Sequence, residues 1–443
     1  MKPTRLLSML LGMALATASV LSSSYVHSQP VSGQQAPRSE PQPPAASPAG
    51  AAASVAPQPV PTLRPLPAFV DKGIAWLAQA QFSNGGWGAG THARQEIRDP
   101  RAVQIDPATT AFAAMALLRT GNTLTTGPYH QHVSKALSYM LEVVDTAPED
   151  GPAITTLTGT QPQTKLGQHI DVAMAAQFFS RVLPHAKHDA ALTARINQGL
   201  DKCLRKLERT QNTDGSWNAQ AWAPVLQSAM AHTALEKAQA AGKRIDSQVL
   251  ERSRAYQKGN VDTARGEVKT DKAAGISLYA LAGNQRATAV EAREAEQVVN
   301  AAKAKKELDA AAPVSVDNLV KAGRSPQQAQ KLFEAYSQNT ATRQMLKDEK
   351  VLSGFGNNGG EEYLSYMLTS EALVVTGGKD WDEWYHSMSQ RLAKIQNANG
   401  SWSGHHCITS PVFSTAAVLL TVTADREVDV LRHEQQPKAA KVQ

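Results

Sequence analysis

Apolar positions recur along the chain with a helical period, in pairs of segments separated by polar loops. The first segment of a pair is amphipathic, as in residues 68–81, where Phe69, Ile74 and Leu77 form one stripe. The second is apolar nearly all round, as in residues 107–119, and such a segment predicts a helix buried among others. The pattern therefore predicts an all-α protein in which outer amphipathic helices cover inner apolar helices.

About six such pairs follow one another between residues 66 and 425. The expected pairs are 68–81 with 107–119, 132–144 with 170–182, 195–211 with 221–238, 247–258 with 273–281, a helix starting at Pro326 with 361–376, and 380–396 with 412–422. Because each unit buries its apolar face on its neighbours, six pairs can close into a ring around the inner helices. Residues 285–311 depart from the pattern and predict an exposed insertion or an elongated outer helix.

A seven-residue phrase, Gln-x-x-Asn/Asp-Gly-Gly/Ser-Trp, ends three of the amphipathic segments. Glycine after Asn or Asp takes the positive φ that a helix exit needs, and an indole can pack over the helix end. We therefore interpret the phrase as architectural. Its first and last residues are Gln81 and Trp87, Gln211 and Trp217, and Gln396 and Trp402.

The phrase resembles the QW motif of squalene and hopene cyclases, and the flanking helices are similar to those of the prenyltransferase and squalene-oxidase repeat superfamily. This resemblance implies an α/α toroid over residues 66–425. It does not carry an activity with it, because one fold hosts many functions.

The acid motif of the triterpene cyclases, Asp-x-Asp-Asp, is not matched. The nearest sequence, Asp380-Trp381-Asp382-Glu383, lies at the start of an expected outer helix, where acidic residues favour the helix dipole. The aromatic content is only 5%, whereas a cyclase lines its cavity with aromatic rings. Both observations argue against cyclase activity.

Two other chemistries of toroid proteins are also not matched. Prenyltransferases bind zinc through Asp-x-Cys and a distant His, but here His405 and His406 precede Cys407 without the Asp. Zinc is therefore possible but disfavoured, with His405 and Cys407 as weak candidate ligands, and we expect no cofactor. The thioester proteins need Cys-Gly-Glu-Gln, and the sequence before Glu361 and Glu362 has no Cys.

In a ring of helix pairs all inner helices begin at the same end, so residues there converge although they are far apart in the sequence. Titratable residues at such a mouth are the candidates for a site, although acidic residues before a helix can also be simple caps. The candidates are Asp106, His169, Asp171, Trp222, Asp271, Glu361, Glu362, His405, His406 and Cys407. A loop with Arg94, Arg98 and Arg101 could meet an anionic ligand or simply be solvated.

The N-terminal region reads as an export signal followed by a spacer. Lys2 and Arg5 precede an uncharged apolar run, which predicts a signal peptide over residues 1–28, or an anchor if it is not cleaved. Residues 29–65 form a Pro/Ala-rich linker, and residues 426–443 a charged, loose tail. We therefore expect a secreted or periplasmic protein.

The overall charge is mild. Loss of residues 1–28 would remove two basic and no acidic residues and lower the formal net charge from +6 to +4, so no nucleic-acid partner is expected. Cys203 and Cys407 fall in the third and sixth units, and we predict that they are not bridged.

These features favour a binding or assembly module without cyclase activity, for an unknown lipid, glycan or protein ligand. The alternative is an enzyme that uses the toroid cavity. Its chemistry would be terpenoid or prenyl transfer or cyclisation around Cys407, or polysaccharide lyase-like chemistry around acidic and arginine residues.

Overall fold

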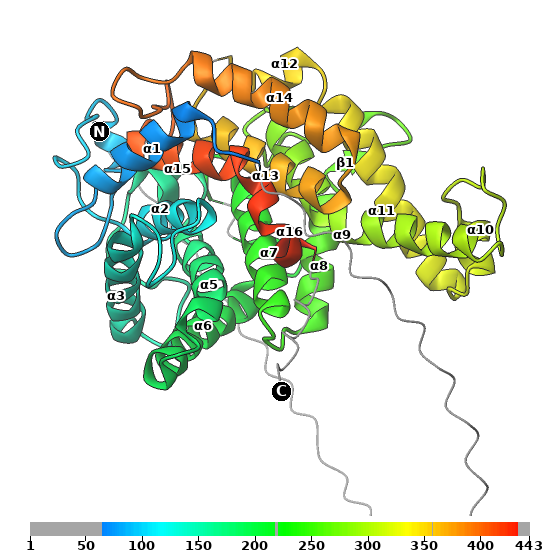
Figure 1. Ribbon diagram of the computed structural model, residues 1–443, viewed down its shortest axis with the longest axis horizontal. Helices are drawn as coiled ribbons and strands as arrows, with labels where there is room; N and C mark the ends of the chain where they lie inside the picture. Colours follow the sequence, from blue (N-terminus) through cyan, green and yellow to red (C-terminus); the bar gives the residue numbers. More distant parts are fainter. Residues whose placement is uncertain (1–63, 218–219, 357, 433–443) are drawn as a thin grey trace, which may run out of the picture. The chain divides into compact units, whose positions relative to one another are not determined.

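Six buried helices pack side by side and close a ring. The computed structural model describes residues 64–217, 220–356 and 358–432. Within them each inner helix contacts the next one, and the last contacts the first (Figure 1). The inner helices are α2 (Pro107–Arg119), α5 (Ile170–Val182), α7 (Pro224–Ala240), α9 (Ser277–Ala304), α13 (Gly360–Thr376) and α15 (Pro411–Val422).

Six amphipathic helices cover the ring from outside. Each buries one stripe against the inner helices and leaves the opposite face polar. These outer helices are α1 (Ala68–Gln79), α3 (His130–Thr146), α6 (Ala190–Thr210), α8 (Ser247–Lys258), α11 (Pro326–Met345) and α14 (Lys379–Lys394). The prediction of an α/α toroid with six outer and inner helix pairs is confirmed.

The loops between the pairs carry the remaining elements. A two-stranded antiparallel sheet pairs β1 (Val261–Asp262) with β2 (Glu267–Val268). The short helices are α4 (Gln161–Lys165), α10 (Val316–Lys321), α12 (Glu349–Leu352) and α16 (Val428–Leu431), and the 3-10 turns are η1 (His92–Arg94), η2 (Leu183–Ala186) and η3 (Ala424–Glu427).

The expectation of an exposed insertion or an elongated outer helix at 285–311 is wrong, because these residues up to Ala304 continue an inner helix. Helix α9 continues without a break from the ring to Ala304. Its second half packs Ala295 and Val299 against Leu319 of α10 and Leu332 of α11 in a small core of its own. The sparse apolar residues of this stretch are therefore a buried stripe, and its charged residues form the exposed face.

The boundaries expected from the sequence are only partly within the described residues. The signal peptide (1–28), most of the linker (29–65) and residues 433–443 of the tail lie outside them. The tail is not loose over 426–432, because η3 and α16 fold back onto α13 and α7. No helix of the described residues is long and apolar enough to cross a membrane.

Each Gln of the repeated phrase joins its own unit to the next. Its Nε2 donates to the carbonyl of the phrase's own glycine and to a first-turn carbonyl of the following outer helix. The second bond runs from Gln81 to His132 over 2.9 Å, from Gln211 to Val249 over 2.9 Å, and from Gln396 to Phe69 over 2.8 Å. Because the third phrase binds α1, it locks the last unit to the first.

Each Trp of the phrase caps the outer helix that precedes it. The three indoles are fully buried, and each Nε1–H donates to the carbonyl ten residues earlier at 2.8 to 2.9 Å. The Trp backbone N–H donates to a hydroxyl of the following inner helix, on Thr110, Ser228 or Thr415. These bonds give the phrase an architectural role.

Candidate functional site

The short helix α4 lies across the mouth of the ring, where the inner helices begin. The Gln161 Oε1 accepts the backbone N–H groups of Thr409 (2.7 Å) and Ser410 (3.1 Å), just before α15. At the other end of α4, the carbonyl of Lys165 accepts the N–H of Ala223, just before α7, over 2.8 Å. Helix α4 thus links the starts of two inner helices that are far apart in the sequence.

Asp106 and Asp171 lie together, and both are engaged with the starts of helices. Asp106 caps α2 and accepts the N–H groups of Thr109 and Ala89, each over 2.8 Å. Asp171 accepts from the N–H of Ala108 (3.1 Å) and from Gln163 (2.7 Å). Burial raises the pKa of Asp106 to about 6, and burial with the charge of Asp106 raises the pKa of Asp171 to about 7. The bonds that Asp106 and Asp171 accept from Thr109 and Ala108 satisfy free N–H groups at the start of α2, as helix caps do.

Three other mouth candidates are not brought into this group. His169 is buried beside the outer layer, with its Nε2 2.9 Å from the Thr210 hydroxyl, and burial lowers its pKa to about 4. Asp271 and His405 are exposed. The backbone N–H of His405 donates to the Asn358 carbonyl.

Glu361 and Glu362 open helix α13 and are fully buried. Glu362 accepts the Tyr279 hydroxyl at 2.6 Å and the N–H groups of Phe355 and Gly359. The Oε2 of Glu361 accepts only the N–H of Ile408, at 3.2 Å, and its Oε1 has no partner among the described residues. Burial, together with the charge of Glu362, raises the pKa of Glu361 to about 8.

Cys407 lies next to Glu361 and Lys165. Its backbone has a φ of +59°, which is rare for a residue with a side chain, and its thiol is half-buried. Burial and the charge of Glu361 raise the pKa of the thiol to about 11, although a hydrogen bond with Lys165 works in the opposite direction. The thiol is therefore protonated at neutral pH.

Two large aromatic side chains are exposed beside these groups. Trp222 is 44% exposed, and the Lys165 ammonium lies 4.7 Å from its ring centre. Phe355 is 55% exposed and packs on His406, whose Nε2 lies 3.9 Å from Glu362. We call Gln161, Lys165, Trp222, Glu361 and Cys407 the rim cluster.

Around the rim cluster, residues that the sequence predicted for the mouth lie beside four that it did not predict. Those expected are Trp222, Glu361, Glu362, His406 and Cys407, and those added by the fold are Gln161, Lys165, Tyr279 and Phe355. Tyr279 lies at a helix start and Phe355 in a loop, without a motif around them. The Gln-Pro-x-x-Lys run after Thr160 has the form of a capped short helix, and this capping box is the signal that could have drawn attention to α4.

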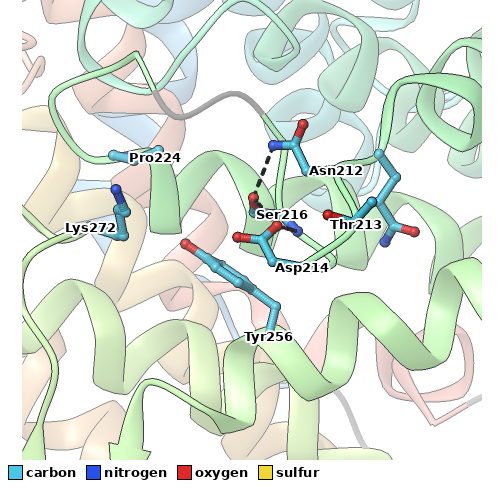
Figure 2. A pocket seen from close by; sticks show the side chains of 8 residues that line it. Asn212, Thr213, Asp214, Ser216, Pro224, Tyr256 and Lys272 are labelled. Carbon is cyan, nitrogen blue, oxygen red and sulfur yellow. Dashed lines mark hydrogen bonds between the residues drawn. The ribbon is translucent and has the colours of Figure 1, made fainter. Parts of the chain in front are cut away.

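A polar hollow of about 650 Å³ lies on the same side of the ring, between the second phrase and the start of α7 (Figure 2). Pro224 and Lys272 lie on one side of it and Asn212, Asp214 and Ser216 on the other, and the Tyr256 hydroxyl points between them. Burial and the charge of Asp214 raise the pKa of Tyr256 to about 12. The hollow adjoins the rim cluster, because Pro224 on its wall is two residues from Trp222.

The loop arginines have partners within the protein. Arg98 donates to the carbonyls of Gly404 and Thr409, and Arg101 donates to the Gln79 carbonyl. Arg94 pairs with Glu96. The geometry therefore favours a structural role for Arg98 and Arg101, because their guanidinium groups tie loops together.

The sequences that were compared with the cyclase and zinc-binding motifs contain Asp380, His405 and Cys407. Asp380 starts α14 and pairs with Arg343 of α11 (3.0 Å) and with Lys347 just after α11 (3.3 Å), away from the mouth. Cys203 and Cys407 are both free thiols, as predicted. Within the described residues, no group of three His, Cys, Asp or Glu side chains could hold a metal ion. A zinc role for His405 and Cys407 stays an untested expectation.

The closed ring of six helix pairs makes this chain an α/α-toroid protein. No protein-family model matches it, and no curated protein does. Among solved structures it is similar to an inactive variant of the alpha-1,6-mannanase GH76A of Salegentibacter sp. HEL1_6 in complex with alpha-1,6-mannotriose. That match has 10% identity over 81% of this chain and 98% of the other, with a TM-score of 0.49.

A second similar structure is a single-residue variant of the type II terpene cyclase MstE from Scytonema in complex with its product merosterolic acid A. This match has 14% identity over 82% of this chain and 96% of the other, with a TM-score of 0.33.

Proposed function

We propose that this protein is an exported glycan-binding α/α toroid whose ligand is held at the mouth of the ring. The observation that carries the proposal is a pair of buried polar atoms without a partner among the described residues. These are the Oε1 of Glu361 and the Nε2 of Gln161. Lys165, at the other end of α4 from Gln161, is close enough to act on Glu361 and packs against the exposed Trp222. A buried donor and acceptor left unpaired are costly, and a polar ligand would satisfy both.

The chemistry of the mouth favours a sugar over a lipid. A sugar ring offers hydroxyl groups to Glu361 and Gln161 and an apolar C–H face to an exposed indole such as Trp222. A lipid chain would need a deep apolar space, but the far halves of the inner helices carry buried charged side chains, among them Arg119, Lys237 and Glu371. The adjoining polar hollow gives a long glycan room to extend past Pro224.

The test is binding of soluble polysaccharides by the mature protein. We would screen neutral, uronic and amino-sugar polymers by affinity electrophoresis and measure the dissociation constant of a hit by calorimetry. Trp222→Ala and Glu361→Gln should each weaken binding about tenfold or more, which corresponds to about 1.4 kcal/mol. Val320→Ala, which truncates a similarly exposed apolar residue on α10, is the matched control and should not change affinity.

Binding that is unchanged in both rim variants would place the ligand elsewhere. If no polymer binds while lipid or protein does, the glycan assignment is wrong. The predicted export is tested separately, by determining the N-terminus and cellular fraction of the natural protein.

A second candidate, an enzyme using acid catalysis at Glu361, is favoured by one observation. A carboxyl group with a pKa of about 8 is protonated at neutral pH, as a general acid must be. Release of new reducing ends from a bound polymer, lost in Glu361→Gln but retained in Glu142→Gln, would support this candidate over simple binding.

A further inference from the structure

The end of the ring opposite the mouth contains a buried network of charges. Glu371 of α13 accepts from Arg119 of α2, from Lys237 of α7 at 3.0 Å and from Arg286 of α9 at 3.4 Å. All four side chains are almost completely buried. One carboxylate therefore serves three cations from three inner helices.

Glu236 of α7 also pairs with Arg286, at 2.7 Å. A third carboxylate enters this network from the C-terminal segment. After α15, the chain folds across the ring through η3 and α16, which we call the C-terminal strap (Ala424–Leu431; Figure 1). The strap carries Glu427, which accepts from Arg119 Nε at 2.8 Å and forms an ion pair with Arg181 of α5. Its side chain is 14% exposed, so it enters from the solvent side.

Arg181 depends on this strap. Its side chain is buried, and its Nε, Nη1 and Nη2 have no hydrogen bond of ordinary geometry within the described residues. Its ion-pair partner is Glu427. A buried guanidinium without an anion is strongly unfavourable. Without Glu427, Arg119 and Arg181 would be left with Glu371, which already accepts from Lys237 and Arg286, while Glu236 pairs with Arg286.

We propose that Arg119 and Arg181 form a carboxylate-binding site at this end of the ring, with Glu427 as its resident occupant. A small carboxylate from solution fills the site when the strap is displaced. Two guanidinium groups match the two oxygens of a carboxylate, and the local excess of positive charge attracts an anion. The site is independent of the glycan proposal, because it uses the opposite ends of the inner helices.

The test is rescue of Glu427→Ala by sodium acetate, with sodium chloride at the same ionic strength as the reference. In chloride the variant should melt well below the wild-type protein. In acetate it should recover at least half of the lost Tm, with a saturable dependence on concentration, while the wild-type protein responds equally to both salts. Glu142→Ala, which removes an exposed carboxylate on α3, is the matched control and should show no difference between the salts.

Removing the second arginine checks the location. The double variant Glu427→Ala with Arg181→Met should lose the acetate response, because one side of the proposed site is gone. If Glu427→Ala responds equally to acetate and chloride, the proposal is overturned. If that variant folds in neither salt, Glu427→Gln keeps the shape of the side chain, and absence of an acetate-specific gain in its Tm likewise overturns the proposal.

Discussion

At the scale of single residues, the buried carboxyl groups at the mouth differ in how many hydrogen bonds they accept. Asp106 and Asp171 each accept two hydrogen bonds, and Glu362 accepts three together with the contact to His406. Glu361 is equally buried but accepts a single backbone bond. The difference matters because a buried carboxylate needs partners to stay ionised.

We predict that Glu361 makes stability fall as the pH rises from about 4.5 to about 8. The pKa is about 8 in the folded protein, whereas the ordinary value of 4.5 applies to the unfolded chain. Between these values the folded state therefore holds a proton that the unfolded chain has lost. Above pH 8, ionisation of Glu361 lowers the free energy of unfolding by on the order of 5 kcal/mol. Urea unfolding of the wild-type protein and Glu361→Gln from pH 5 to 9 measures it.

The variant should gain stability relative to the wild-type protein as the pH rises, because glutamine does not ionise. Glu142→Gln on the surface is the control and should follow the wild-type curve. Parallel curves for Glu361→Gln and the wild-type protein would contradict the assigned burial of this charge.

The sequence could predict part of the mouth and not the rest. Glu361, His406 and Cys407 belong to short runs that resemble known motifs, and the ring register places them at one end. Gln161 and Lys165 are the two ends of the short helix α4, which is too short for a periodic pattern, and Gln161 meets Thr409 across 248 positions of sequence. Such contacts exist only after the ring has closed, so no local pattern reveals them.

At the scale of elements, the predictable feature is the end of an outer helix, and the unpredictable one is the length of an inner helix. The repeated seven-residue phrase predicts where α1, α6 and α14 end. Helix α9 has no such signal after Leu281, although its packing changes from the ring, which still includes Ala289, to the small core with α10 and α11, which begins at Ala295. The composition of α9 changes because its packing partners change. From the sequence pattern alone, this change looks like the start of a separate element.

We predict that Trp217→Ala lowers the free energy of unfolding by about 3–5 kcal/mol, as expected for a buried large aromatic. The indole is fully buried, and its Nε1–H binds the Leu207 carbonyl at 2.9 Å. Trp222→Ala, which removes the same side chain from an exposed position, is the control and should cost less than about 1 kcal/mol. Equal losses for the two variants in urea unfolding would be inconsistent with a clamp at Trp217.

At the scale of the whole molecule, the centre of the ring is polar at both of its ends. The mouth holds carboxyl groups and Lys165, and the other end holds Glu371 with its cations. Buried ion pairs contribute little net stability compared with apolar packing, but leaving one partner alone costs much more. The network therefore favours the single arrangement of helices in which every charge meets its partner.

The closed ring has a testable consequence at its seam. Gln396 of the last unit binds the carbonyl of Phe69 in α1, and Gln211 makes the equivalent bond inside the array. In an open array, loss of the terminal bond would only fray the two end units. In a ring both bonds are internal, so Gln396→Ala, which loses two hydrogen bonds, should lower the global free energy of unfolding by about 1–3 kcal/mol. Gln211→Ala should lower it by at least as much, because the Gln211 Oε1 also accepts from Arg252. Native-state hydrogen exchange distinguishes the two cases, because faster exchange confined to α1 and α14 in Gln396→Ala would mean that the seam opens by itself.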